Sequence, residues 1–203
     1  MTPPSTPRVI SSDTRRENRI PPGQVETRKW PVLHAGDTPQ VDLATWDFRV
    51  FGLVKSIARW SWDEFRALPA VETLADMHCV TRWSRLNMVW NGVAVREVMK
   101  HVDVLPGAKF VIAHCEHGFT TNLPLDEFLA DDAVLAWGAN GQPLEPDHGW
   151  PLRLVVPKLY AWKSAKWLRA IEIAVHDRPG YWERGGYHMH GDPWTEERYG
   201  SGG

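Results

Sequence analysis

The spacing of apolar residues constrains the fold more than any other feature of this chain. Apolar, β-branched runs of strand length are separated by turn signals, and helical spacing is always brief. Strands are predicted at residues 46–54, 70–80, 109–115, 134–137, 152–156 and 168–175. Because strands and helices do not alternate regularly, the pattern predicts an α+β fold with mixed sheets, short helices and long coil.

The helices that the spacing allows are short. They are predicted at residues 61–68, 93–101 and 124–129. The first has the best-defined start, because Ser61 and Glu64 stand three residues apart, as in a capping box. Asn91-Gly92 and Asn140-Gly141 are turn signals, and the second is typical of a β-hairpin.

The two ends of the chain differ from its middle. Residues 1–24 are polar, contain the break Pro21-Pro22-Gly23 and lack the apolar stretch of a secretory signal, so we expect a disordered arm. Residues 25–203 are predicted to form a single domain, which ends in a coil from Arg178 onward. A length of 203 residues agrees with one domain or two.

Composition argues against several functional classes. The net charge of −2 gives no reason to expect nucleic acid as a partner. No apolar run approaches the ~18 residues that suggest a membrane span. The only cysteines are Cys79 and Cys115, too few for a disulfide framework, so a reduced protein in the cytoplasm is expected. Twelve tryptophans are a high count, and they belong either to the core or to a ligand pocket.

Cys79 lies at the end of a predicted strand, in the run His78-Cys79-Val80-Thr81-Arg82-Trp83. A thiol among polar, cationic and aromatic neighbours is a candidate nucleophile or metal ligand, because local charge controls its reactivity. The alternative is a small buried hydrophobic residue, which is the commoner role of a single cysteine.

Two further segments contain cations in apolar or aromatic surroundings. Arg153 lies inside the β-branched run that follows His148, and a buried arginine needs an anionic ligand or a carboxylate partner. Lys163, Ser164 and Lys166 lie between tryptophans, a set that could grip an anionic heteroaromatic ligand. A structural ion pair at Arg153 and a solvated turn at the lysines are the simpler alternatives.

Together these segments resemble the molybdopterin domain of the sulfite oxidase family. The cysteine, the run from Asp147 to Pro157 and the Lys-Ser-Ala-Lys segment occur in the family's order, over roughly residues 27–176. The nearest resemblance is to short bacterial members that lack haem and dimerisation domains. The run Gly186–Trp194 is also similar to that subgroup. The resemblance implies a sulfite oxidase-like molybdopterin-binding fold.

The resemblance also implies a cofactor and its contacts. Cys79 would bind molybdenum together with the dithiolene of one pterin that has no nucleotide extension, and a soft thiolate suits such a metal. The cofactor contacts implied are Trp30, Val32, Leu33, His34, Cys79, His148, Arg153, Lys163, Ser164, Ala165 and Lys166.

Two arginines follow the cysteine, at a spacing that departs from the family's arginine pair. Arg82 and Arg85 are predicted to act with Cys79 in catalysis, by attracting an oxyanion or polarising an S=O group. The predicted reaction is two-electron oxygen-atom transfer on a small oxyanion or an S- or N-oxide. Electrons would be exchanged with a separate donor or acceptor protein.

Three other functions fit some of the same residues. A thiol enzyme would use Cys79 as the nucleophile and one of the histidines 78, 114 or 148 as the base. A non-catalytic pterin-binding or electron-transfer module would hold the cofactor without turnover. A zinc site would use His114, Cys115 and His117, although their spacing is tighter than that of usual structural zinc motifs.

Overall fold

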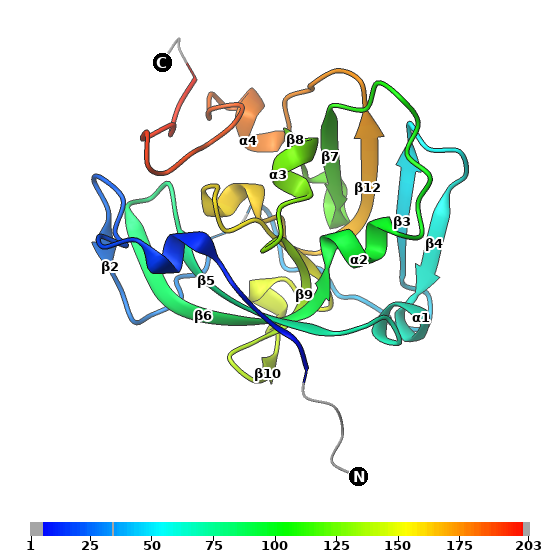
Figure 1. The fold of residues 1–203 in the computed structure, drawn as a ribbon, viewed down its shortest axis with the longest axis horizontal. Helices are drawn as coiled ribbons and strands as arrows, with labels where there is room; N and C mark the ends of the chain where they lie inside the picture. The colour runs from blue at the N-terminus through cyan, green and yellow to red at the C-terminus, as the bar shows by residue number, and fades with distance from the viewer. Residues whose placement is uncertain (1–5, 34, 201–203) are drawn as a thin grey trace.

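The computed structural model describes residues 6–33 and 35–200. Figure 1 shows two β-sheets joined by short helices and long loops. The helices are α1 Trp62–Arg66, α2 Val95–Met99, α3 Leu125–Phe128 and α4 Tyr181–Arg184. The strands are β1 Arg8–Ile10, β2 Val25–Glu26, β3 Asp47–Gly52, β4 Ala58–Ser61, β5 Val71–His78, β6 Trp83–Ala94, β7 Phe110–Cys115, β8 Thr120–Pro124, β9 Val134–Ala139, β10 Gln142–Pro143, β11 Arg153–Val155 and β12 Leu168–Ala174.

The two sheets have different topologies in the described part of the chain. The first has seven strands in the order β1-β5-β6-β9-β10, with β11 paired to β9 and β2 to β6. The second has five strands in the order β4-β3-β12-β7-β8. Parallel and antiparallel pairs occur in both sheets, so the predicted α+β class with mixed sheets is confirmed.

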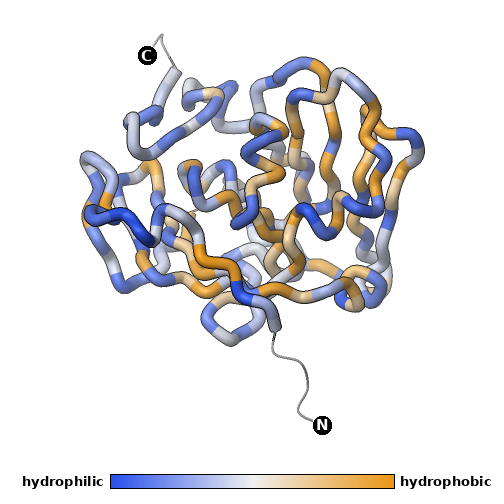
Figure 2. The backbone as a smooth tube through the Cα atoms, viewed as in Figure 1, coloured by the Kyte–Doolittle hydropathy of each residue, from blue (hydrophilic) through white to orange (hydrophobic). Residues whose placement is uncertain are grey.

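One apolar core lies between the sheets. Phe48 and Ile171 of the five-stranded sheet belong to the same buried cluster as Val93 and Leu135 of the seven-stranded sheet. In Figure 2 the hydrophobic colour follows the strands, while loops and chain ends are mostly hydrophilic. None of the helices in the described residues has both the length and the apolarity that crossing a bilayer requires.

Local sequence signals predicted three of the four α-helices in the described residues, and the fourth, α4, lies in the segment predicted to be coil. The capping box is present at α1, where the Ser61 hydroxyl accepts from the Glu64 amide at 3.4 Å. The Glu64 carboxylate in turn accepts from the Ser61 amide at 2.8 Å. Helices α2 and α3 and the hairpin between β9 and β10 also lie where the sequence predicts them.

The longest strand, β6, was missed because its sequence contains a misleading signal. Asn91-Gly92 was predicted to be a turn, but both residues belong to β6, where a bulge interrupts the pairing with β9. A Cβ atom at Gly92 would lie 2.1 Å from the carbonyl oxygen of Leu135. The glycine is therefore required by close approach of two strands and not by chain reversal. Strands β4 and β8 were also missed.

The described part of the segment predicted to be a disordered arm takes a definite path. Strand β1 pairs in parallel with β5, and a 3-10 turn follows at residues 12–15. Arg19 then donates two hydrogen bonds to the Asp76 carboxylate, at 2.6 and 2.9 Å. These contacts are made with residues far away in the sequence, so local periodicity does not reveal them.

Candidate active site

Cys79 lies at the tip of the hairpin formed by β5 and β6. Its amide donates to the carbonyl of Trp83 at 2.9 Å, and its own carbonyl accepts from the Arg82 amide at 3.0 Å. Arg82 has a φ of 72°, which turns the chain sharply enough for β6 to begin at once. This tight turn fixes the position of the Cys79 side chain.

The Cys79 thiol is almost enclosed, with 7% of the residue exposed. Burial raises its pKa, and a hydrogen bond of 3.1 Å from the Thr81 hydroxyl to Sγ opposes the rise. No histidine bonds to this sulfur among the described residues. His78 instead contacts Ser84 at 2.8 Å, and burial lowers the pKa of His78 to about 4. A thiolate here therefore needs a bound metal more than a general base.

A cavity of about 200 Å³ opens beside Cys79. It brings together eight of the predicted site residues, from segments far apart in the sequence: Trp30, Leu33, Cys79, His148, Arg153, Ser164, Ala165 and Lys166. Strand β11 positions Arg153, and the loop from β11 to β12 supplies residues 164–166. Because this loop links the two sheets, the cavity lies where the sheets meet.

Arg153 is a buried cation without a carboxylate partner among the described residues. Its guanidinium donates to the carbonyls of His148 at 2.8 Å and Ser164 at 2.7 Å. Its Nε has no partner in the described part of the chain, and burial lowers the pKa of Arg153 to about 9. A structural ion pair within the described chain is thus excluded as the reason for this arginine, which suits an anionic ligand instead.

Lys166 and His148 lie at the same end of the cavity. The Lys166 ammonium donates to the carbonyls of Leu33 and Asp147, each at 2.9 Å. Burial, and then the nearby Arg153 charge, lower the pKa of Lys166 to about 7. His148 stacks on Trp30 with 3.8 Å between ring centroids, and burial lowers the pKa of His148. Together, Lys166, Arg153, His148 and Trp30 can hold a phosphate and a flat ring side by side.

Four of the predicted site residues do not line the cavity. Val32 and Arg82 are exposed to solvent, and Arg85 lies over the face of Trp30 at 5.5 Å. Lys163, predicted to contact the cofactor, is fully buried and paired with Glu183 at 2.7 Å. His34, also predicted, lies outside the described residues.

Sequence reasoning missed a set of aromatic residues that line the cavity, called here the aromatic wall. Its members are Trp83, Phe119, Trp162, Trp182 and Tyr187. The tryptophan count was the only signal for them, because they come from β6, a loop before β8, the loop before β12 and the segment around α4. This wall makes the part of the cavity near Cys79 mostly apolar.

The donor set also limits which metal group fits. The described residues contain no group of three or more His, Cys, Asp and Glu side chains that could hold a metal ion. A metal at Cys79 must therefore bring its other ligands, as a metal chelated by a dithiolene does. The zinc alternative at residues 114–117 has no such cluster in the described chain, and Cys115 is a buried core thiol whose pKa burial raises. Cys79 and the buried Arg153 guanidinium fit a molybdenum cofactor with an anionic tail.

Comparison with models of protein families matches residues 35–182 to the oxidoreductase molybdopterin-binding domain. The chain belongs to this family. The predicted enzyme class, a sulfite oxidase-like molybdopterin-dependent oxidoreductase, is thereby confirmed. The predicted cofactor, molybdenum bound to molybdopterin, is confirmed at the level of the family.

Two relatives and one solved structure show how far the similarity extends. The oxidoreductase YuiH of Bacillus subtilis is 49% identical over 91% of this chain and 93% of its own length. The catalytic subunit MsrP of a protein-methionine-sulfoxide reductase from Gluconobacter oxydans is 28% identical, over 68% of this chain and 50% of its own length. The crystal structure of the sulfane dehydrogenase SoxCD of Paracoccus pantotrophus has a TM-score of 0.67 and 22% identity, and covers 76% of this chain and 44% of its own. The last similarity supports the fold alone.

Proposed function

We propose that this protein catalyses two-electron oxygen-atom transfer, with molybdenum bound by Cys79 and one pterin without a nucleotide extension. The proposal rests mainly on one observation. The buried thiol of Cys79, which can bind a metal, shares a cavity with Arg153, a buried cation that meets no carboxylate in the described chain. When bound, the molybdenum group supplies the oxygen-transfer chemistry. Arg153, Lys166 and His148 would hold the cofactor's phosphate and ring edge.

We further propose that the substrate is a neutral S- or N-oxide and not an inorganic oxyanion. The wall near Cys79 is aromatic, and its rings favour an apolar substituent on the substrate. The two arginines predicted to attract an oxyanion, Arg82 and Arg85, do not line the cavity. The names of relatives cover both substrate classes, since MsrP is named for a sulfoxide and a 29% identical protein of Hordeum vulgare is a nitrate reductase, so the choice rests on the lining of the cavity. Electrons would come from a separate protein.

The roles of the protein groups follow from their environments. The aromatic wall excludes water and orients the substrate, and the Thr81 hydroxyl at 3.1 Å from Sγ stabilises the Cys79 thiolate. Since burial alone raises the pKa of Cys79, the thiolate form depends on a cation at the sulfur. The protein therefore keeps this thiol inert until the metal group binds.

The test is a Cys79→Ser variant, with Cys115→Ser as a matched buried thiol. Protein purified from cells that make the cofactor is analysed for molybdenum, for pterin fluorescence and for turnover with a reduced dye. Cys79→Ser should lose molybdenum and all turnover of dimethyl sulfoxide, while Cys115→Ser should keep both. Undiminished molybdenum in Cys79→Ser would rule out the metal role.

The same preparation separates the alternatives. A thiol enzyme would act without molybdenum, and a non-catalytic module would hold the pterin without reducing any oxide. Turnover of methyl phenyl sulfoxide and trimethylamine N-oxide, with little oxidation of sulfite, is the result that we expect. Efficient sulfite turnover would instead favour an oxyanion substrate.

A further inference from the structure

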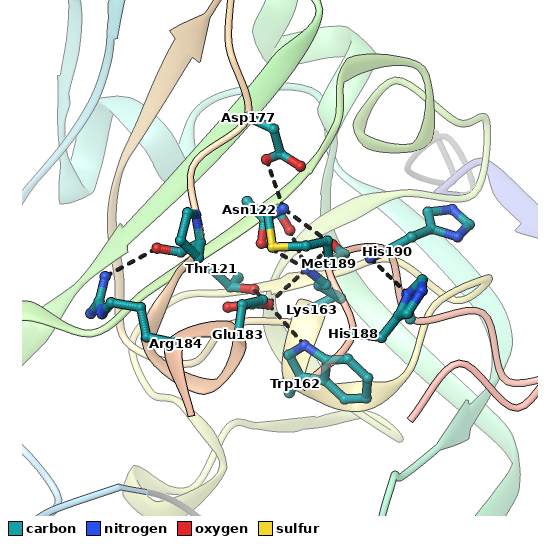
Figure 3. Close-up of polar contacts among 12 residues, drawn as sticks. Thr121, Asn122, Trp162, Lys163, Asp177, Glu183, Arg184, His188, Met189 and His190 are labelled. Carbon is teal, nitrogen blue, oxygen red and sulfur yellow. Dashed lines mark hydrogen bonds and ion pairs between the residues drawn. The ribbon is translucent and has the colours of Figure 1, made fainter. Parts of the chain in front are cut away.

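A buried ion pair joins the loop before β12 to helix α4. The Lys163 ammonium lies 2.7 Å from the Glu183 carboxylate, and neither side chain is exposed. The same ammonium donates to the carbonyls of Asn122 at 2.7 Å and Met189 at 2.6 Å, as Figure 3 shows. Burial lowers the pKa of Lys163, and the Glu183 charge opposes that change. Each charge would be costly alone, so the two side chains require one another.

One oxygen of Glu183 accepts three hydrogen bonds. The donors are Lys163 at 2.7 Å, the indole nitrogen of Trp162 at 2.9 Å and the Thr121 hydroxyl at 2.9 Å. The three donors come from two segments, the loop before β12 and strand β8, so the carboxylate is held from two sides (Figure 3). A carboxylate fixed in this way also fixes the edge of the Trp162 indole.

Trp162 is the member of this cluster that reaches the cavity. It lines the cavity together with Cys79, and the two residues belong to one apolar cluster. The ring of Trp162 meets Tyr160, stacked at 5.3 Å, and Tyr187, edge-on at 5.1 Å. The hydrogen bond to Glu183 is therefore the polar contact that sets the direction of an otherwise apolar wall residue.

Glu183 also neighbours two other wall residues in the sequence. Trp182 directly precedes it, and Tyr187 follows after the end of α4. The rings of Trp182 and Tyr187 stack on each other with 5.2 Å between centroids. The contacts that anchor Glu183 thus anchor the part of the wall that comes from the C-terminal segment.

We propose that Glu183 is a positioning residue for the substrate-facing wall, acting through the indole of Trp162 and balanced by Lys163. The inference rests on the proposed function, because it requires the substrate to enter the cavity beside Cys79. Trp162 contacts the substrate and Glu183 does not. Loss of the carboxylate should weaken substrate binding more than it slows oxygen transfer, since the reacting atoms stay at Cys79.

Two double variants separate this role from a purely structural one. Both Lys163→Met/Glu183→Gln and Lys163→Met/Glu183→Met remove the ion pair at similar side-chain volume. Only the first keeps an oxygen that can accept from the Trp162 indole. If the pair merely stabilised the fold, the two variants would behave alike, whereas a positioning role predicts that they differ.

The first measurement follows the indole N–H signals of ¹⁵N-labelled protein by NMR, with the Trp162 signal assigned from its absence in Trp162→Phe. The signal should stay near its wild-type position in Lys163→Met/Glu183→Gln and move in Lys163→Met/Glu183→Met. Glu197→Gln, which changes another carboxylate of the C-terminal segment, is the control and should leave the Trp162 signal unchanged. An unmoved Trp162 signal in Lys163→Met/Glu183→Met would overturn the proposal.

The second measurement is the Kd of methyl phenyl sulfoxide, obtained from the shift of the same indole signal during titration. We expect Lys163→Met/Glu183→Met to raise Kd and KM about fivefold, with kcat within about twofold, and Lys163→Met/Glu183→Gln to stay near wild type. Equal Kd values in the two variants would refute the positioning role. If wild-type protein holds no molybdenum, the proposed reaction fails, but the Kd comparison still decides the role of Glu183.

Discussion

Two buried cations of this chain have different partners, and the difference separates structure from function. Lys163 faces the Glu183 carboxylate, whereas Arg153 donates only to carbonyl oxygens among the described residues and lies over the rings of Trp30 and Trp90. A buried guanidinium without a counter-charge costs folding free energy unless a ligand supplies the anion. This contrast supports the proposed role of Arg153 in binding the anionic part of the cofactor.

Replacing Arg153 by Met tests this assignment. The variant loses a buried positive charge and the Nε donor that has no partner in the described chain, so the Kd of the pterin should rise roughly 10- to 100-fold. Pterin fluorescence after gel filtration measures the loss. Arg169→Met is the control, because Arg169 pairs with Asp47 and Glu116 away from the cavity. Equal pterin in both variants would remove Arg153 from the cofactor site.

If Lys166 binds the cofactor as proposed, we expect cofactor retention to depend on pH. Its pKa is lowered to about 7, so the free protein loses this positive charge as the pH rises through neutrality. Affinity for an anionic cofactor should accordingly weaken between about pH 6 and pH 8. Lys166→Arg keeps its charge throughout that range and should flatten the dependence. A flat profile in the wild type would contradict this role of Lys166.

Single residues of the site could be predicted from the sequence where an unusual residue type stood in or beside an apolar run. Cys79 and Arg153 are unusual residue types at the end of, or inside, apolar runs, and the structure brings both to one cavity with His148. Glu183 and Tyr187 were not, because they come from a segment without periodicity that reaches the cavity only through tertiary contacts. The two arginines after Cys79 were predicted on proximity in sequence alone, and the sharp turn at Arg82 directs the chain so that neither lines the cavity.

At the scale of elements, β6 shows why a turn signal can mislead. Local dipeptide chemistry suggested that the chain reverses at Asn91-Gly92, but β9 approaches Gly92 too closely for any side chain. Helix α1 was easier, since its capping box is complete within four residues. Elements defined by local bonds can be predicted, and elements defined by neighbouring strands need the tertiary fold.

Gly92→Ala should destabilise the protein through β6. The added methyl group would lie 2.1 Å from the Leu135 carbonyl, so the strands must separate at an expected cost of about 1–3 kcal/mol. The midpoint of urea unfolding measures it. Gly200→Ala is the control, because its nearest contacts would lie at 3.9 Å, and it should be close to neutral. A midpoint unchanged in Gly92→Ala would mean that β6 and β9 are not packed this tightly.

At the scale of the whole molecule, residues 13–22 and residues 194–198 meet over the hairpin that presents Cys79. Arg16 lies 4.0 Å from the ring of Trp194, and the Trp194 indole donates to Asp13 at 3.3 Å. Arg198 donates to the carbonyls of Val80 at 2.8 Å and Pro22 at 3.2 Å. In Figure 1 the blue and red segments lie on the same side of the molecule, near β5 and β6.

The N-terminal segment should therefore contribute to stability. Arg19→Met leaves the buried Asp76 carboxylate without its main partner, and we expect a loss of about 2 kcal/mol, reduced from the buried-pair value because Arg19 is 24% exposed. Arg8→Met breaks an exposed pair with Glu72 and should cost under about 1 kcal/mol. Thermal unfolding of both variants gives the comparison. Similar losses would show that the Arg19 contact is no stronger than a surface pair.

The late position of Glu183 and Arg198 in the sequence also orders events during biosynthesis. A ribosome produces Cys79, β11 and the cationic loop first, and the residues that complete the wall emerge after them. Until the later segment has been made, the cavity lacks the wall residues Trp182 and Tyr187. We expect the cofactor to bind more easily while these two side chains are not yet in place.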